Sequence, residues 1–481
     1  MASSDDYIIF KVFFGIIESI SRRFMNKKYT AKVILVMGIL FASTFGGAMT
    51  SAYSVKKKDG YDGKYEFIRT TSEAQQIYES SEAGVNVVLA RDGTINFSKA
   101  SFIKSGDIKS DDADYTGVNA AVLSIGSSKI KVMDSSIVSH ATHASAVFAF
   151  GDSTIDISDS TIETEKDSSP ALSVTNGGVI MATNVVAETT GDKSIPIKVG
   201  KDGGTISIVG GKYKSTGNDS PAVYTTANVK ISDSAKFDVA AANAFVIENT
   251  KEKAEALFML KDSNVTLARG NMFSISNANT RINVEKTIFK SGVGVKNFLN
   301  AKQSSVIMSL KKNPVSGDIK LDENSKLDLS LSTRAQYKGA INTDNKAKSV
   351  VLKVDRSSVI ILTGDSYVSE LRNSKKDNSN IYANGHKLFV NGKEVSIKEG
   401  EYKELEYDFS TETTEPIKIE IKEDKTGLFI LLAVMIVAFL MALTSVFIIL
   451  SKNKARKQRQ AEREVIERAS RNNLKKPWER A

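Results

Sequence analysis

The chain has 481 residues, of which 41% are hydrophobic, so it is long enough for more than one domain and apolar enough to bury a core. It contains no cysteine, which excludes disulfides and cysteine-ligated zinc. The formal net charge of +9 lies at the two ends: residues 54–425 hold 48 Lys/Arg and 49 Asp/Glu, so the middle lacks the basic face that nucleic-acid binding needs.

The N-terminal residues predict membrane association. Residues 1–32 carry six Lys/Arg, and the stretch 7–20 within them is too short and too charged to span a bilayer, so we expect it in the membrane interface. Residues 33–53 are apolar, and the basic flank before them predicts a cytoplasmic N-terminal side. Ser, Thr, Gly and Ala at the end of this run leave two alternatives, a cleaved signal peptide and a retained signal anchor.

Residues 54–84 precede a repeated region and are predicted to cap its N-terminal end. Open ends of stacked β coils expose strand edges and usually need a cap. Within this segment Thr71–Glu82 has the pattern of a short amphipathic helix, which we expect to supply the cover.

Residues 85–397 repeat at intervals of about 25 residues, with two apolar ladders that lengthen and shorten together and a third, looser ladder. The first ladder is Val122, Val147, Leu172, Ile197, Val223 and Val246; the second is Ile130, Ile155, Ile180, Ile206 and Val229; the third is Ile137, Ile162, Ala187, Tyr213 and Phe237. Three short β stretches per repeat predict an all-β fold, a parallel β-helix of twelve or thirteen coils. The preference of parallel crossovers predicts right-handed winding.

A further column predicts a corner of each coil: Asp134, Asp159, Asn184, Gly210 and Asp233. Asp, Asn and Gly tolerate left-handed backbone dihedrals, and their exchange within the column favours a turn over the alternative of a calcium or catalytic row. Pro170, Pro196 and Pro221 recur near strand starts, where a missing N–H costs least.

The C-terminal part predicts an anchor. Residues 398–426 are acidic and strand-like, as in a closing hairpin or stalk, and residues 427–450 form an uncharged apolar run long enough for a transmembrane helix. The basic tail 451–481 is expected in the cytoplasm. We expect the tail to act as a stop-transfer flank that attracts anionic lipid. The alternative is a docking helix for a cytoplasmic partner, with the apolar stripe Val465, Ile466 and Ala469.

Three stretches resemble a known group of proteins: "INTDN" at 341–345, "LTGDSYVSEL" at 362–371 and "NIYANGHKLFVNGKEV" at 380–395. They are similar to the closing coils of β-helical, pectin-lyase-like or autotransporter-passenger-like cell-surface proteins of gut Firmicutes. The resemblance covers roughly residues 118–397 and implies the fold more than an activity. The chain departs from autotransporters in ending with an apolar helix instead of a β-barrel.

Few residues suggest chemistry. Asp111, Asp112 and Asp114 beside Lys109 lack the spacing of a lyase calcium site and predict an exposed loop. His140 and His143 would need a turn between them to share a metal, and His386 is isolated. Tyr213 and Tyr224 are candidate sugar platforms with apolar ladder neighbours, and the lone tryptophan, Trp478, falls in the tail.

The sequence therefore predicts a cell-membrane protein with an extracellular rod and a cytoplasmic tail. No residue is assigned to catalysis, a cofactor or a metal. The expected role is adhesion, surface interaction or assembly of an envelope complex, with membrane lipid and other proteins as partners and no nucleic acid. The alternative is a glycan-binding or polysaccharide-cleaving protein, and a polysaccharide lyase is the enzyme class left open.

Overall fold

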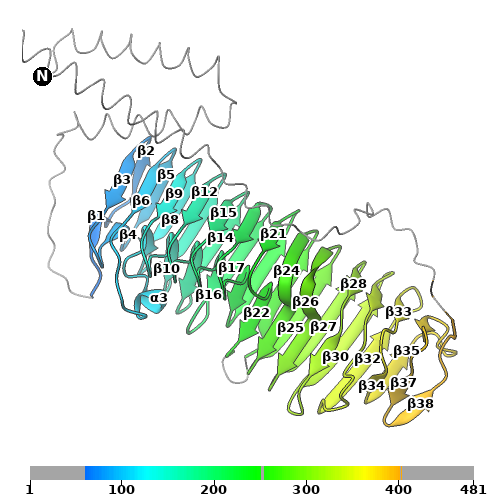
Figure 1. Cartoon of the computed structure of the whole chain (residues 1–481). Coiled ribbons are helices and arrows are strands. Elements are labelled where there is room, and N and C mark those ends of the chain that lie inside the picture. Colours follow the sequence, from blue (N-terminus) through cyan, green and yellow to red (C-terminus); the bar gives the residue numbers. More distant parts are fainter. Residues whose placement is uncertain (1–59, 251–253, 401, 403–481) are drawn as a thin grey trace, which may run out of the picture. The chain divides into compact units, whose positions relative to one another are not determined.

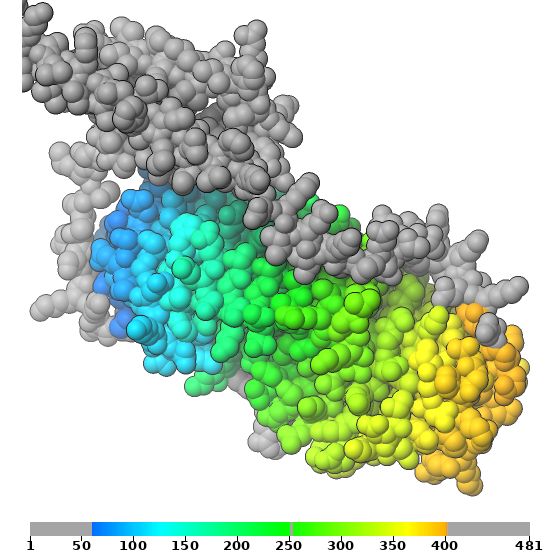
Figure 2. All heavy atoms as spheres, in the orientation of Figure 1, coloured from blue at the N-terminus to red at the C-terminus, as the bar shows by residue number. Residues whose placement is uncertain are grey.

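A computed structural model describes residues 60–250, 254–400 and 402. In this part the chain forms an all-β parallel solenoid of about 13 coils, with one four-residue helix, α3 (Ala113–Thr116) (Figure 1). The chain colours follow one another along the solenoid, so each coil stacks on its predecessor (Figure 2). At about 4.8 Å per coil, the stack is about 60 Å long.

Each coil has three strand positions. The first position holds β1 (Gly63–Phe67), β4 (Asn86–Ala90), β7 (Val122–Ser124), β10 (Val147–Phe150), β13 (Leu172–Thr175), β16 (Ile197–Val199), β19 (Val223–Thr225), β22 (Phe245–Glu248), β29 (Ile319–Leu321), β34 (Ser366–Val368) and β37 (Leu388–Val390). The second holds β2 (Thr71–Ala74), β5 (Thr94–Ser98), β8 (Lys129–Met133), β11 (Thr154–Ser158), β14 (Val179–Thr183), β17 (Thr205–Val209), β20 (Asn228–Ser232), β23 (Ala256–Lys261), β25 (Asn279–Glu285), β27 (Ser305–Lys311), β30 (Lys326–Ser332), β32 (Ser349–Val354) and β35 (Glu370–Asn373).

The third position holds β3 (Ile77–Ser80), β6 (Ser101–Lys104), β9 (Ser136–Ser139), β12 (Thr161–Thr164), β15 (Val186–Thr189), β18 (Lys212–Ser215), β21 (Lys236–Val239), β28 (Pro314–Ser316), β31 (Gln336–Lys338), β33 (Val359–Ile361) and β36 (Ile381–Tyr382). Two long strands, β24 (Asn264–Ser276) and β26 (Ile288–Lys302), run from the third position of one coil into the first position of the next. They therefore join the first and third faces of the coils up to β29 into one 18-stranded sheet, while the second face is a separate 13-stranded sheet. The later third-position strands β28, β31, β33 and β36 form a four-stranded sheet, and β34 and β37 belong to a three-stranded sheet.

The strand registers confirm the second and third predicted ladders in full. The first ladder is confirmed from Val122 to Val223, but its last step pairs Val223 with Phe245, so Val246 was placed one residue too far along. Phe245 and Ile247 point inward and Val246 points outward. Because all three residues are apolar, the sequence could not distinguish these two registers.

The predicted corner is also confirmed, since Asp134, Asp159, Asn184, Gly210 and Asp233 all have positive φ angles between 49° and 67°. Inside the coils the ladder side chains form one continuous apolar core. Each buried Val, Leu, Ile or Phe in it contributes about 1.5–3 kcal/mol to folding.

The predicted helical cap is wrong. Residues 71–82 form β2 and β3 of the first coil, separated by a corner at Gln75 with φ 56°. Their backbones pair with β5 and β6, and this parallel pairing outweighs the modest helix propensity of the segment. The regular coils thus begin at Gly63, before the expected boundary at residue 85.

The C-terminal end of the solenoid closes with an antiparallel pair, β37 with β38 (Lys393–Val395). This hairpin lies before the stretch at 398–426 where we expected it. Among residues 60–250, 254–400 and 402, no helix has the length and apolar character to cross a membrane. The predicted membrane segments 33–53 and 427–450, the interfacial segment, the stalk and the tail lie outside the described residues.

Lys104, at the end of β6, predicts how stability depends on pH. Its side chain has no exposed surface, and its Nζ donates to the carbonyl oxygens of Glu82 (2.7 Å) and Ser105 (2.6 Å). Burial lowers the pKa of Lys104 to about 8, although the carboxylates of Glu82 and Asp107 oppose this. At pH values between about 8 and the usual lysine pKa, Lys104 keeps its proton in the unfolded chain but loses it in the folded chain. The free energy of unfolding therefore rises with pH in this range.

We expect denaturant titrations of Lys104→Met to lack a gain of about 2 kcal/mol that the parent protein shows between about pH 8 and about pH 10. The comparison stops there because buried Tyr213 and Tyr337 have raised pKa values, and ionisation of the unfolded tyrosines lowers stability at higher pH. The same pH profile for both proteins would show that Lys104 is not the group responsible.

Candidate functional site

The outward side of the first-position strands changes character along the solenoid. Successive coils place Leu89, Leu123, Phe148, Ser173, Lys198, Tyr224 and Val246 in one outward row. The early members pack under the excursion 105–120 as a small second core outside the coils. Beyond Ser173 this cover ends, and the row becomes the floor of a cleft.

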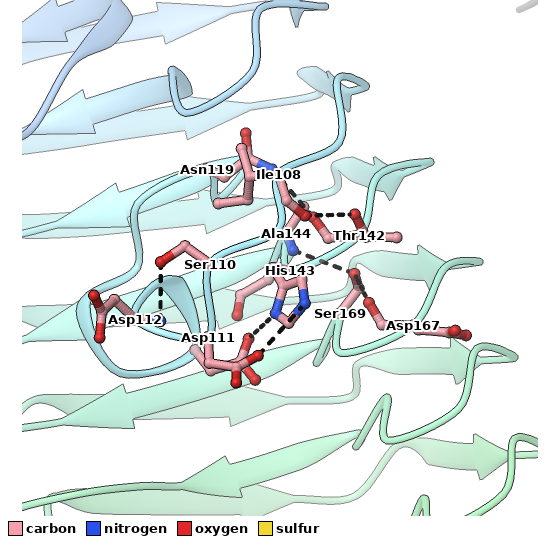
Figure 3. Close-up of polar contacts among 12 residues, drawn as sticks. Ile108, Ser110, Asp111, Asp112, Asn119, Thr142, His143, Ala144, Asp167 and Ser169 are labelled. Atoms are coloured by element: carbon pink, nitrogen blue, oxygen red, sulfur yellow. Dashed lines mark hydrogen bonds and ion pairs between the residues drawn. The ribbon is translucent and has the colours of Figure 1, made fainter.

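The excursion is fastened to the coils by polar contacts around His143 (Figure 3). Nδ1 of His143 lies 3.1 Å from Oδ1 of Asp114, and Nε2 lies 3.8 Å from Oδ1 of Asp111. Thr142 adds two hydrogen bonds, from its backbone N–H to Asp107 (2.8 Å) and from its hydroxyl to the carbonyl of Ile108 (3.0 Å). These contacts hold α3 against the solenoid wall.

Gly117 ends α3 with φ 78°, and its N–H donates to the carbonyl of Ala113. A Cβ at this position would lie 2.7 Å from both Leu123 and Phe148. Glycine is therefore needed twice, for the left-handed turn and for close packing on the second core.

The cleft beyond α3 has a volume of about 1020 Å³, at the upper end of the range for ligand sites. Lys198, Tyr224 and Val246 form its floor, and Asp114 and Tyr115 close one end. Its charged lining comprises three lysines, Lys193, Lys198 and Lys201, and five carboxylates, Asp112, Asp114, Asp202, Asp219 and Glu248. This balance favours a neutral or weakly charged ligand over a polyanion.

Lys198 is the buried cation of the cleft, with 9% of its surface exposed. Its Nζ lies 3.7 Å from Oδ2 of Asp114 and 5.7 Å from the centre of the Tyr115 ring. Burial lowers the pKa of Lys198, and Asp114 opposes that shift. The pair thus links the floor to α3 across 84 residues of chain.

Tyr115 and Tyr224 give the cleft its aromatic surface. Tyr115 is 46% exposed, and its carbonyl accepts a hydrogen bond from the Thr175 hydroxyl (2.8 Å). Burial raises the pKa of Tyr224, and the nearby carboxylate of Glu248 raises it further. The Tyr224 hydroxyl is therefore a protonated donor at neutral pH.

The other residues singled out in the sequence have different fates. Tyr213 is not a sugar platform, because it is 1% exposed and stacks on Phe237 inside the coils. The acidic loop is only partly exposed as predicted: the Asp111 side chain is 90% exposed, but Asp114 is largely buried against His143 and Lys198. That burial follows from the folding of α3 back onto the wall.

The histidines take separate partners. Nδ1 of His140 contacts Glu165 at 2.7 Å, whereas His143 contacts Asp114 of α3 and Asp111 just before it. Nδ1 of His386 lies 4.0 Å from Asp365, far along the chain from the other two. Trp478 lies outside the described residues.

Sequence reasoning missed Lys198 and Tyr115. The sequence does contain a signal for Lys198, because the residue after each first-ladder position faces outward. This outward row starts with Leu and Phe, and Lys198 and then Tyr224 in the next coil interrupt it. Comparisons of the chain with known protein families, curated proteins and solved structures find no match. The geometry of the cleft is therefore the ground for the functional proposal.

Proposed function

We propose that the protein is a membrane-anchored extracellular rod that acts in adhesion, in surface interaction or in the assembly of an envelope protein complex. The observation that supports this most is the cleft of about 1020 Å³ on the side of a long, continuously packed solenoid. Segments 33–53 and 427–450 would anchor the rod, with the tail 451–481 in the cytoplasm. The coils would wind right-handed, as parallel crossovers favour.

We propose that the resemblance of roughly residues 118–397 to β-helical surface proteins of gut Firmicutes reflects the same role. Replacing residues 1–53 with a cleavable signal peptide and deleting residues 427–481 is expected to release the protein from the membrane fraction and to abolish surface attachment. Affinity purification of the intact protein from membranes then distinguishes a complex subunit, which brings stoichiometric companions, from a free adhesin. Removal of residues 54–425 in a separate variant tests the ectodomain. Unchanged surface attachment in each of the two variants would count against the proposal.

Saccharide binding in the cleft is a second candidate, and Tyr115 and Tyr224 favour it. Aromatic rings pack on the apolar faces of sugar rings, and the surrounding carboxylates and the amide of Asn243 suit their hydroxyls. The mixed charge of the lining directs the search toward neutral or amino sugars.

Tyr224→Ala is expected to weaken binding of any glycan that the protein retains on an array by about tenfold, since an aromatic contact contributes about 1–1.5 kcal/mol. Tyr224→Phe keeps the ring and is the matched control, so it should lose much less. Equal affinity of the alanine variant and the parent would remove the cleft from glycan recognition. If the protein retains a uronic-acid polymer, incubating the two with calcium and analysing the polymer for shorter products distinguishes cleavage from binding.

A further inference from the structure

A second cleft, of about 560 Å³, lies at the corner between the second and third strand positions, near β26, β28 and β31. Figure 1 labels β26 and β28. Lys286, Lys312 and Arg334 line it from three consecutive coils. Between them the cleft is lined by Ile288, Pro314 and Gln336, which are neighbours in adjacent coils. None of the lining residues is acidic.

The three cations are poorly compensated. Coils rise by about 4.8 Å, so the like charges of Lys286 and Lys312, which follow paired strand ends, are stacked at a spacing where they repel. Arg334 lies one residue past the position in register with Lys312. Lys286 has a partner in Asp262, whose Oδ1 lies 3.6 Å from Nζ. Within residues 60–250, 254–400 and 402, neither Lys312 nor Arg334 forms an ion pair.

The acidic residue at this corner in the following coil is already occupied. Asp355, in the next coil, accepts hydrogen bonds from the backbone N–H groups of Thr333 (2.7 Å) and Ser358 (2.7 Å). These backbone contacts lower the pKa of Asp355 although its partial burial opposes them. Asp355 is not among the residues that line the cleft.

Gln336 adds an independent observation. Its side-chain nitrogen is buried and has no hydrogen-bond partner within the described chain. A buried unpaired donor is unfavourable unless something accepts from it. The cleft therefore holds three cationic groups and one unpaired hydrogen-bond donor, and no acidic side chain lines it to balance them.

The backbone at this corner makes the cations more unusual. Lys286, Lys312 and Arg334 have φ angles of 47°, 51° and 64°, in the left-handed region. Six successive earlier coils, from Asp134 to Asp262, fill the same corner with Asp, Asn or Gly, which adopt this conformation more easily. The first two coils have Gln75 and Lys99 there. Turn geometry alone thus does not account for three successive long cationic side chains.

We propose that this cleft binds the anionic group of a ligand, a carboxylate, sulfate or phosphate, whose apolar part rests on Ile288 and Pro314. The cations would neutralise the anion and Gln336 would donate to it. This site is separate from the first cleft and does not depend on the proposed adhesive function.

Calorimetric titration of the full-length protein in nonionic detergent tests the proposal with hexanoate, hexyl sulfate and hexyl phosphate, which distinguish the three anion types. Hexanol tests the apolar part alone, and inorganic phosphate tests the anion alone. We expect at least one hexyl anion to bind at least tenfold more tightly than hexanol and inorganic phosphate. Its affinity should fall as salt is raised.

Lys312→Asn is expected to weaken that binding by at least tenfold, because it removes a charge while keeping a residue type that tolerates positive φ. Lys99→Asn is the matched control: Lys99 occupies the equivalent corner near the N-terminal end with φ 53°, but it does not line the cleft. Circular dichroism establishes that both variants keep the fold.

Three results would overturn the proposal. The first is no hexyl anion binding more tightly than hexanol. The second is equal loss of affinity in Lys99→Asn and Lys312→Asn. The third is inorganic phosphate binding as tightly as hexyl phosphate, which would remove Ile288 and Pro314 from the site.

Discussion

Replacing Ile180 with aspartate is expected to destabilise the solenoid by more than about 4 kcal/mol, because the change combines two separate costs. Ile180 lies in β14 with no exposed surface, between Ile155 and Ile206 of the adjacent coils. Loss of the buried side chain costs about 1.5–3 kcal/mol, and an unpaired carboxyl group inside the coils costs several more. Denaturant unfolding followed by circular dichroism measures the loss.

Thr183→Asp is the matched control for this change. Thr183 is exposed on the same strand, and its neighbours in the flanking coils, Ser158 and Val209, are uncharged. We expect its effect to stay within about 0.5 kcal/mol. Similar destabilisation by both substitutions would contradict the assignment of Ile180 to the interior.

The effect of Ile180→Asp should also be local at first. In a solenoid each coil contacts only its neighbours, so stability is approximately a sum of coil and interface contributions. Hydrogen exchange in the Ile180→Asp variant should therefore quicken first in the strands around β11, β14 and β17. Uniform acceleration along all coils would instead indicate fully cooperative unfolding.

The coil architecture could be predicted because inward-facing residues must repeat at the length of a coil. Ile130, Ile155, Ile180 and Ile206 keep one register since each packs on the residue above and below it. Corners are similarly visible, because only a few residue types adopt positive φ easily. The same reasoning failed at Val246, because Phe245, Val246 and Ile247 are three consecutive apolar residues.

Internal serines show a second repeat that apolar pattern reading overlooks. Backbone N–H groups of Ala144, Ser169 and Ser194 donate to the hydroxyls of Ser169, Ser194 and Ser220 in the next coils, at 2.9–3.2 Å. These serines are fully buried, so each hydroxyl serves as a link between coils. A search for polar residues at coil spacing would have found them.

The clefts could not be predicted in this way, because outward-facing residues need not repeat. The outward row does single out Lys198 and Tyr224 as polar residues after Leu and Phe, but that change does not show a cleft until the wall around them is known. Asp114 reaches Lys198 only because α3 folds across the first-position strands. That folding depends on His143 and Gly117 together, which no periodicity connects.

Asp114→Ala is expected to destabilise the protein by about 3–5 kcal/mol, because it leaves the ammonium of Lys198 buried without its carboxylate. The substitution also removes the 3.1 Å contact with His143 that helps fasten α3. Denaturant unfolding measures the overall loss, and hydrogen exchange should show early opening of residues 107–120.

The double variant Asp114→Ala with Lys198→Met tests whether the unpaired charge is the cause. Methionine fills similar space without a charge, so the double variant should be more stable than Asp114→Ala alone. The deficit of the single variant should also shrink as pH rises, since burial already lowers the pKa of Lys198 and loss of Asp114 lowers it further. A deficit that is independent of pH and unrelieved by Lys198→Met would mean that Asp114 acts through His143 and α3 instead of through the buried amine.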